Sequence, residues 1–177
     1  MIKQVFLLML GALLCAPVTA EVVASANAGF EIRIETAVDA PPAEVWAQFL
    51  AVGEWWDGEH SWFGKAENFS IEPRAGGCFC ETEGDKSVLH MLVSYVNPQT
   101  HEMRMIGGLG PLQGLALHGA MVWKFEPTES GGTRIVHTYR VMGYMKEGLD
   151  TLAPVVNRVQ AIQVARLSAR VAPSPSS

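Results

Sequence analysis

Hydrophobic and polar residues alternate along several short stretches of the chain. In "EIRIETAV" (31–38), Ile32, Ile34, Thr36 and Val38 lie on one side and the charged residues on the other. This period of two predicts a half-buried strand. Between residues 69 and 142 we expect about six more strands, in antiparallel order, because alternating stretches there are separated by turn signals such as "NPQT" and "TESGG".

Two stretches have helical spacing instead. "DAPPAEVWAQFL" (39–50) predicts a helix in which Asp39 can cap the first turn. The aromatic-rich "GEWWDGEHSWFG" (53–64) is either a second short helix or a loop. Residues 150–171 predict a long terminal helix whose apolar stripe faces the sheet. The stripe consists of Leu152, Val155, Val156, Val159 and Ile162.

This order of elements predicts an α+β fold. One strand is followed by one or two short helices, a run of antiparallel strands and a long helix. A long helix with an apolar stripe must cover a sheet to bury that stripe. We therefore expect a single domain over residues 30–172.

The first twenty residues have the layout of a secretory signal peptide. Lys3 precedes an apolar run over 5–14, and small residues precede a cleavage point after Ala20. The run is shorter than the ~20 residues that a spanning helix needs. We expect a signal peptide over 1–20, a linker over 21–29, a disordered tail over 173–177 and a periplasmic or secreted protein.

Charge narrows the range of partners. The formal net charge is −5, with 13 basic and 18 acidic residues. A net negative chain of this kind argues against binding nucleic acid or an anionic membrane surface. We also expect no membrane span in the mature chain. The sequence leaves any protein partner unknown.

Four segments together resemble the SRPBCC (START-like, helix-grip) superfamily: "DAPPAEVWAQF", "EPRAGGCF", "VSYVNPQTHEMR" and "GGTRIVHTY". The likeness is nearest to the bacterial polyketide cyclase/dehydrase-like and heat-shock-ATPase-activator-like branches. It implies a helix-grip fold, in which a strongly curved sheet wraps around the C-terminal helix. It also implies a cavity for an apolar ligand between them.

Cys78 and Cys80 in "GGCFCETE" allow three interpretations. Alternate residues of a regular strand are ~6.7 Å apart at Cα, whereas a disulfide needs Cβ atoms about 3.5–4.5 Å apart. Buried thiols are therefore favoured over a disulfide, although a bulge next to Gly76–Gly77 would allow the bond. Zinc is the third interpretation, with His60 and His90 as the imidazole ligands.

The register of the next hairpin bears on that zinc site. A two-residue turn at Gly84–Asp85 pairs Glu83 with Lys86 and places Cys80 opposite Leu89, with His90 on the other face. A loop one residue longer would place His90 opposite Cys80. We favour the two-residue turn, which puts Leu89, Met91, Val93 and Tyr95 beside the cysteines on an inward apolar face and turns Glu81 outward.

The inward faces predict a ligand-binding wall rich in sulfur and aromatic groups. The "GGLGPLQG" segment (107–114) is expected as a bent strand or flap. Trp55 and Trp56 are candidates for the cavity entrance, or for a helix packing on the sheet. The expected wall contains Trp55, Trp56, Cys78, Cys80, Met91, Met103, Met105, Met121, Trp123, His137, Tyr139, Val155 and Val159.

These observations favour an exported protein that binds or carries a small hydrophobic or aromatic molecule without a cofactor. The alternative is a cyclase- or dehydratase-like enzyme in which His137 and Tyr139, the only inward polar pair, transfer protons. A protein-interaction module is a third interpretation, which export disfavours. A simpler one remains, that all these side chains fill a solid core.

Overall fold

The computed structural model describes residues 17–172, which form one antiparallel sheet in the order β1-β2-β8-β7-β6-β5-β4-β3. The strands are β1 (Thr19–Ala26), β2 (Gly29–Val38), β3 (Phe69–Ile71), β4 (Cys78–Glu83), β5 (Lys86–Asn97), β6 (Glu102–Gly107), β7 (His118–Pro127) and β8 (Thr133–Met142). The helices are α1 (Pro42–Leu50) and α2 (Ala153–Arg170), and five 3₁₀ segments complete the fold.

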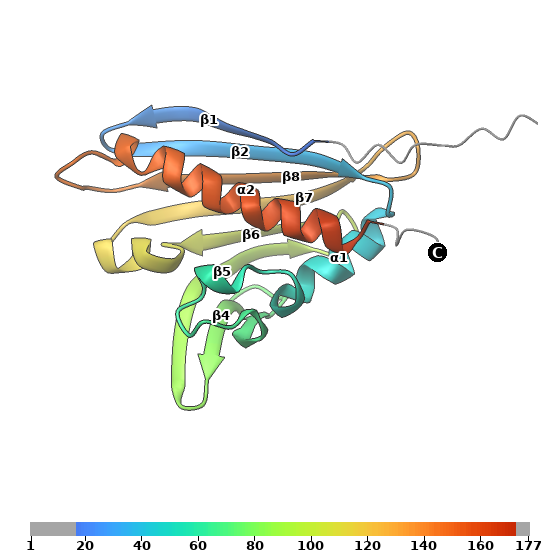
Figure 1. Cartoon of the computed structure of the whole chain (residues 1–177), viewed down its shortest axis with the longest axis horizontal. Helices are drawn as coiled ribbons and strands as arrows, with labels where there is room; N and C mark the ends of the chain where they lie inside the picture. Colours follow the sequence, from blue (N-terminus) through green and yellow to red (C-terminus); the bar gives the residue numbers. More distant parts are fainter. Residues whose placement is uncertain (1–16, 173–177) are drawn as a thin grey trace, which may run out of the picture.

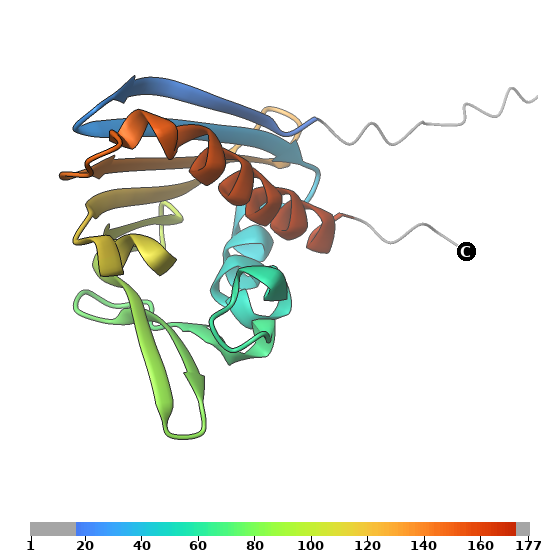
Figure 2. The ribbon, with the colours of Figure 1, turned by 60° about the vertical axis from the view of Figure 1, so that its left-hand side comes forward.

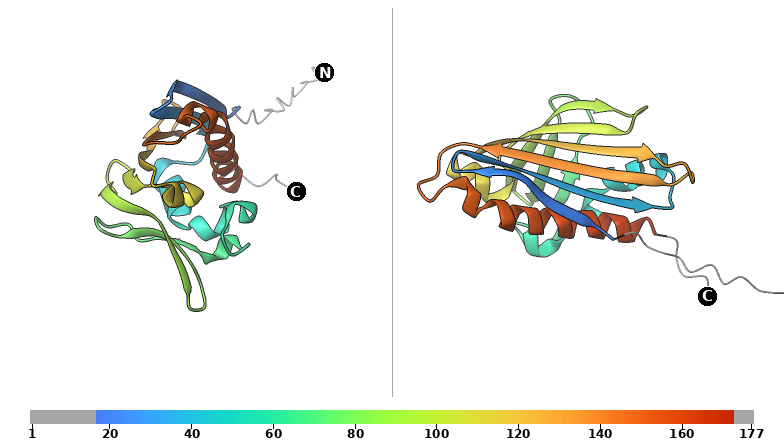
Figure 3. Two further views of the ribbon diagram at one scale, coloured as in Figure 1. Left: turned by 90° about the vertical axis from the view of Figure 1, so that its left-hand side faces the viewer. Right: turned by 90° about the horizontal axis from the view of Figure 1, so that it is seen from above.

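The sheet is strongly curved, and α2 lies on its concave side (Figures 1 and 2). Helix α2 packs mainly on β2 and β1, at one edge of the sheet. The β4–β5 hairpin projects from the opposite edge, as the end-on view shows (Figure 3). The expected α+β helix-grip architecture is confirmed. None of the helices within residues 17–172 is both long and apolar enough to cross a membrane.

Alternation along β2 and β8 follows the sequence pattern. Ile32 and Ile34 are fully buried. On the outer face, Arg134 Nη2 lies 2.8 Å from Glu35 Oε2 across the two strands. Apolar side chains therefore point to α2 and charged pairs to solvent, as a half-buried antiparallel sheet requires.

Residues 21–29, expected as a linker, instead carry most of β1 and the turn into β2. Glu21 pairs with Arg33 and Val22 with Ile32. Most side chains of β1 are exposed. The strand therefore needs no alternation of apolar and polar residues, and its sequence does not predict it. Backbone hydrogen bonds to the edge of β2 form the strand. The expected cleavage point at Ala20 falls inside β1, whereas residues 1–16 and 173–177 of the expected signal peptide and tail lie outside the described residues.

The inward face expected for β4 was wrong. The two-residue turn is confirmed, because Glu83 pairs with Lys86 and Cys80 with Leu89. The register then shifts, so that Phe79 pairs with Met91 and His90 becomes an extra residue on β5. Phe79 and Glu81 are consequently buried, while Cys78 and Cys80 are half-buried on the outer face.

The bulge also overturns the expectation for β5. Leu89 and Tyr95 are 48% and 38% exposed, respectively, whereas Met91 and Val93 are buried. A bulge changes which alternate residues of a strand face inward. The apolar residues of β5 are therefore divided between the inner and the outer face of the sheet. A second register shift, between Val93 and Tyr95, has the same effect further along the strand.

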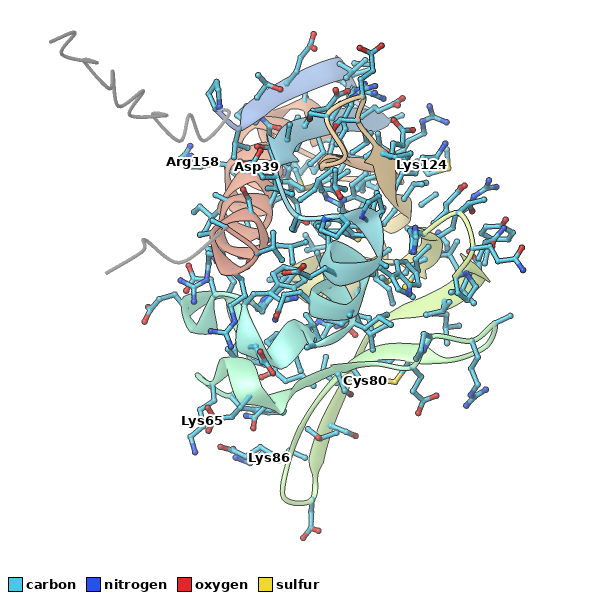
Figure 4. All side chains as sticks on the ribbon, turned by 90° about the vertical axis from the view of Figure 1, so that its right-hand side faces the viewer. Asp39, Lys65, Cys80, Lys86, Lys124 and Arg158 are labelled. Atoms are coloured by element: carbon cyan, nitrogen blue, oxygen red, sulfur yellow. A yellow bond between two sulfur atoms is a disulfide. The ribbon has the colours of Figure 1, made fainter. Side chains whose placement is uncertain are left out.

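Cys78 and Cys80 form a disulfide, contrary to the preference for thiols. Their Cα atoms are 5.4 Å apart, closer than the ~6.7 Å of a regular strand. The register of β4 on β5 shifts between Phe79 and Cys80, within the segment that the disulfide spans. The sulfur of Cys80 lies beside the β4–β5 strands, away from α2 (Figure 4).

The face of α2 that packs on the sheet differs from the expected stripe, of which Leu152 and Val156 pack against the core. The buried residues are Ala153, Gln160, Gln163, Val164, Leu167 and Ser168. Val155 and Ile162 are 50% and 36% exposed, respectively. Two buried glutamines are possible because both side chains have hydrogen-bond partners on other elements.

Helix α1 lies within the predicted segment 39–50, which confirms that prediction. Its side chains Val45, Trp46 and Phe49 are buried. The expected cap by Asp39 is wrong, because Pro41 holds the N-cap position without a side-chain hydrogen bond. Pro42, the first residue of the helix, instead has the backbone angle φ that a first helical turn needs and lacks only an N–H group that would have no partner there.

Replacing Leu167 by Ala tests the packing of α2. Leu167 is fully buried, so Leu167→Ala is expected to lower the free energy of unfolding by about 2–5 kcal/mol. The matched change Ile162→Ala, on the exposed stripe, is expected to cost less than about 1 kcal/mol. Urea denaturation measures both. Equal costs would contradict the burial of the Leu167 face.

Candidate functional site: a cavity beside the N-terminal half of α2

A cavity of about 560 Å³ lies between the N-terminal half of α2 and the concave face of the sheet. Its other walls are the 3₁₀ segment η4 (Gly110–Leu115) and the loop around η2 (Gly58–His60). The lining residues are Trp56, Glu59, His60, Ser61, Trp62, His90, Leu109, Gly110, Pro111, Leu112, Leu115, Tyr139, Leu152, Val155, Val156, Val159 and Gln160.

The wall is largely apolar, and part of it is exposed to solvent. Trp62, Leu115 and Val155 are 53%, 49% and 50% exposed, respectively. These three side chains come from the η2 loop, η4 and α2. A concave chamber lined mainly by apolar side chains is the usual form of a small-molecule site.

The C-terminal half of α2 fixes the loop that closes one end of the cavity. Gln163 Oε1 accepts a hydrogen bond from the Asp57 backbone N–H at 2.9 Å, and Gln163 Nε2 lies 3.1 Å from His60 Nδ1. Arg166 Nε donates to the Trp55 carbonyl at 2.8 Å. The loop is thus tied to the part of α2 that is itself buried.

Tyr139 fixes the opposite wall. Its hydroxyl accepts a hydrogen bond from the Leu109 N–H at 3.0 Å and donates to the Gly107 carbonyl at 3.2 Å. A Cβ atom at Gly119 would lie 2.5 Å from Tyr139 Cε2, so the tyrosine ring needs glycine at that position of β7. The Tyr139 hydroxyl therefore fixes the backbone just before η4 both as a hydrogen-bond acceptor and as a donor.

His137 lies behind the cavity wall. Its ring stacks on Trp123 with centroids 4.0 Å apart, and Nε2 lies 3.1 Å from Gln160 Oε1. Complete burial lowers the pKa of His137 to about 3, although hydrogen bonds to Gln160 and the Val122 backbone oppose that shift. The imidazole is thus neutral at physiological pH.

Burial raises the pKa of Tyr139 to about 12, with a smaller opposing effect from the hydrogen bond to Leu109. A phenol in this state does not give up its proton near neutral pH. His137 and Tyr139 both point inward as expected, but only Tyr139 belongs to the cavity wall, and its hydroxyl already has two protein partners.

The structure brings together part of the predicted wall. Trp56, Tyr139, Val155 and Val159 line the cavity. The remainder of the inward set packs in the core and not on the cavity: Trp55, Met91, Met103, Met105, Met121, Trp123 and His137. The expected flap over 107–114 is η4 with its leading turn, and it does line the cavity. Cys78 and Cys80 are excluded from the wall by their outward orientation.

The alternative zinc set is not assembled. Cys78 and Cys80 are joined to each other on the outer face, and His90 and His60 belong to the inner side. Across residues 17–172, no group of three His, Cys, Asp or Glu side chains is arranged to hold a metal ion.

The sequence pattern did not predict a buried pair at the cavity, of which only His90 lines the wall. Glu81 is fully buried and His90 is 3% exposed, and their side chains lie 3.1 Å apart. The regular alternation predicts both side chains on the outer face, and the bulge at His90 reverses that orientation. The available signal was the pair of glycines before β4, which indicated that a bulge was possible in this hairpin.

Comparisons with known proteins identify the fold. The sequence matches no family model and no curated protein. Among solved structures, EF2215 from Enterococcus faecalis, a conserved protein of unknown function, has a TM-score of 0.58 at 15% identity, covering 90% of this chain and 80% of its own. An uncharacterized protein from Rhizobium leguminosarum has a TM-score of 0.56 at 20% identity, covering 86% and 96%, respectively.

CalU16 from Micromonospora echinospora has a TM-score of 0.52 at 16% identity, covering 90% of this chain and 86% of its own. These identities are low, so the likenesses concern the fold alone. The fold places the cavity but does not assign a function to it.

The depressed pKa of His137 predicts a specific loss of stability in acid. Below the unfolded-state value of about 6.5, the unfolded chain binds a proton that the folded His137 excludes. The contribution of His137 to the free energy of unfolding is complete above that pH. It falls by about 2 kcal/mol between pH 7 and pH 5.

We expect His137→Phe to reduce the difference in unfolding free energy between pH 7 and pH 5 by about this 2 kcal/mol, whatever its effect at pH 7. Urea denaturation of both proteins at the two pH values measures it. An identical pH dependence in the two proteins would contradict the neutral buried state.

Proposed function

We propose that this protein binds a small, largely apolar molecule in the cavity beside α2. The observation that supports the proposal is the chamber of about 560 Å³ with its apolar wall and partly exposed rim. Small-molecule sites typically enclose roughly 300–1,000 Å³ and are lined in this way. A core that merely filled itself would leave no space of this size, because protein interiors are close-packed.

Membership of the SRPBCC superfamily is part of the same proposal. The helix-grip architecture and the order of the four resembling segments support it. That resemblance independently suggested a ligand cavity between sheet and helix.

The alternative, an enzyme that transfers protons with His137 and Tyr139, has less support. His137 is outside the cavity wall, and both directions of the Tyr139 hydroxyl are committed to Gly107 and Leu109. A binding or carrier role needs neither group to react.

Filling the cavity tests the binding proposal. Val159 is half-buried in the wall, whereas its neighbour Arg158 is exposed (Figure 4). We expect Val159→Trp to weaken binding of the apolar fluorophore N-phenyl-1-naphthylamine at least about tenfold, because the indole occupies the ligand volume. Arg158→Trp is the matched control and should leave binding unchanged.

Fluorescence titration measures both variants, and urea denaturation checks that each is folded. Unaltered binding by a folded Val159→Trp protein would place the fluorophore elsewhere and remove the support for this cavity.

We further propose that the chain is exported and cleaved after Ala20. The leader pattern supports export, and a disulfide at Cys78–Cys80 fits an oxidising compartment. Cleavage there would leave Glu21–Ala26 to pair with β2, since Glu21 and Val22 already have partners on that strand.

N-terminal sequencing of protein from the periplasm or medium is expected to begin at Glu21, with Cys78 and Cys80 resistant to alkylation until reduced. Ala20→Leu should block the cleavage, because the position needs a small side chain. Protein that keeps Met1 and remains in the cytoplasm would contradict export.

A further inference from the structure

The strongest feature that the binding proposal leaves unexplained is the buried Glu81–His90 pair. His90 Nε2 lies 3.1 Å from Glu81 Oε2, on side chains that are 2% and 0% exposed, respectively. Buried ionisable groups cost free energy unless their hydrogen bonds are complete. Every polar atom of the pair therefore needs a hydrogen-bond partner.

Glu81 is fully supplied with donors. Its carboxylate accepts hydrogen bonds from Ser61 Oγ at 2.6 Å and from the backbone N–H groups of Trp62 and Phe63 at 3.0 and 2.8 Å, in addition to His90. Burial alone would raise the pKa of Glu81, but these hydrogen bonds outweigh it and hold that pKa below its usual value. Glu81 is therefore an anion, which can only accept hydrogen bonds.

The anion fixes the state of His90. Since Glu81 only accepts, Nε2 of His90 must carry the hydrogen between them. Burial lowers the pKa of His90, and the opposing effect of Glu81 does not reverse the shift. The ring is consequently neutral, and Nδ1 is left with a lone pair and no hydrogen.

That nitrogen has no partner in the protein. Within residues 17–172, His90 Nδ1 is buried without a hydrogen bond. Phe69 and Phe79 pack together beside the ring, with centroids 5.1 and 5.4 Å from His90, respectively, and 5.5 Å from each other. His90 is also one of the residues that line the cavity.

We propose that His90 is the specificity-determining residue of the cavity, where Nδ1 accepts a hydrogen bond from a hydroxyl group on an otherwise apolar ligand. This inference rests on the proposed binding function. Glu81 is a positioning residue, because it sets the tautomer that makes Nδ1 an acceptor. An acceptor selects ligands that can donate, and a buried acceptor left unpaired penalises those that cannot.

A pair of probes isolates that single hydrogen bond. 2-Naphthol and 2-methoxynaphthalene share the same apolar rings, but only the first can donate. We expect the wild-type protein to bind 2-naphthol about tenfold more tightly. His90→Phe should abolish the preference, because it keeps an aromatic ring in the wall and removes the acceptor.

His118→Phe is the matched control, since His118 is exposed on β7 and is not among the residues that line the cavity. The preference for 2-naphthol should survive that change. Because loss of His90 removes one donor to Glu81, urea denaturation must show that the His90→Phe protein is folded.

A measurement on the unaltered protein covers the case in which His90→Phe does not fold. The ¹⁵N resonance of the unprotonated ring nitrogen of His90 is expected to shift when 2-naphthol binds and to move much less with 2-methoxynaphthalene. Equal binding of the two probes, with no selective shift, would overturn the role of His90 and leave the cavity proposal standing. Failure of both probes to bind would overturn both proposals.

Discussion

The structure depends on the way α2 divides its contacts along its length. Val164 and Leu167, in the C-terminal half, are fully buried, whereas Val155, in the N-terminal half, is half exposed. The C-terminal half is thus anchored in the core, whereas the N-terminal half, although Ala153 is buried, also forms a wall of the cavity. Because α2 packs on β1 and β2 at one edge of the curved sheet, the concave face of the central strands is left for other elements to close.

Those elements are held by polar contacts that would be costly to lose. Gln163 and Arg166 bind the η2 loop, and Tyr139 binds the start of η4. Each of these side chains is anchored in α2 or in the sheet, so the cavity walls belong to the rigid part of the fold. A site built on supported elements keeps its shape without a ligand, which lowers the cost of ordering on binding.

A single extra residue at His90 has consequences on both faces of the sheet. On the inner face it lets His90 and Met91 both point inward, and β4 turns Glu81 inward to meet His90. On the outer face lie Cys78 and Cys80, whose disulfide is therefore away from the cavity. Bulges often reposition side chains at functional sites, and here the bulge positions the buried pair that the cavity borders.

The sequence by itself determined the α+β class, the α1 and α2 segments, the inner face of β2 and β8, and the turn at Gly84–Asp85. Those features depend on local periodicity and turn chemistry, which a sequence displays directly. Tertiary structure alone decided strand β1, the face of α2 and the inward side of β4. Strand β1 depends on backbone pairing with β2, the face of α2 on hydrogen bonds to Gln160 and Gln163, and β4 on a bulge in its partner strand. Each of these contacts joins residues that are distant in the chain or shifts a register by one, so no local pattern records it.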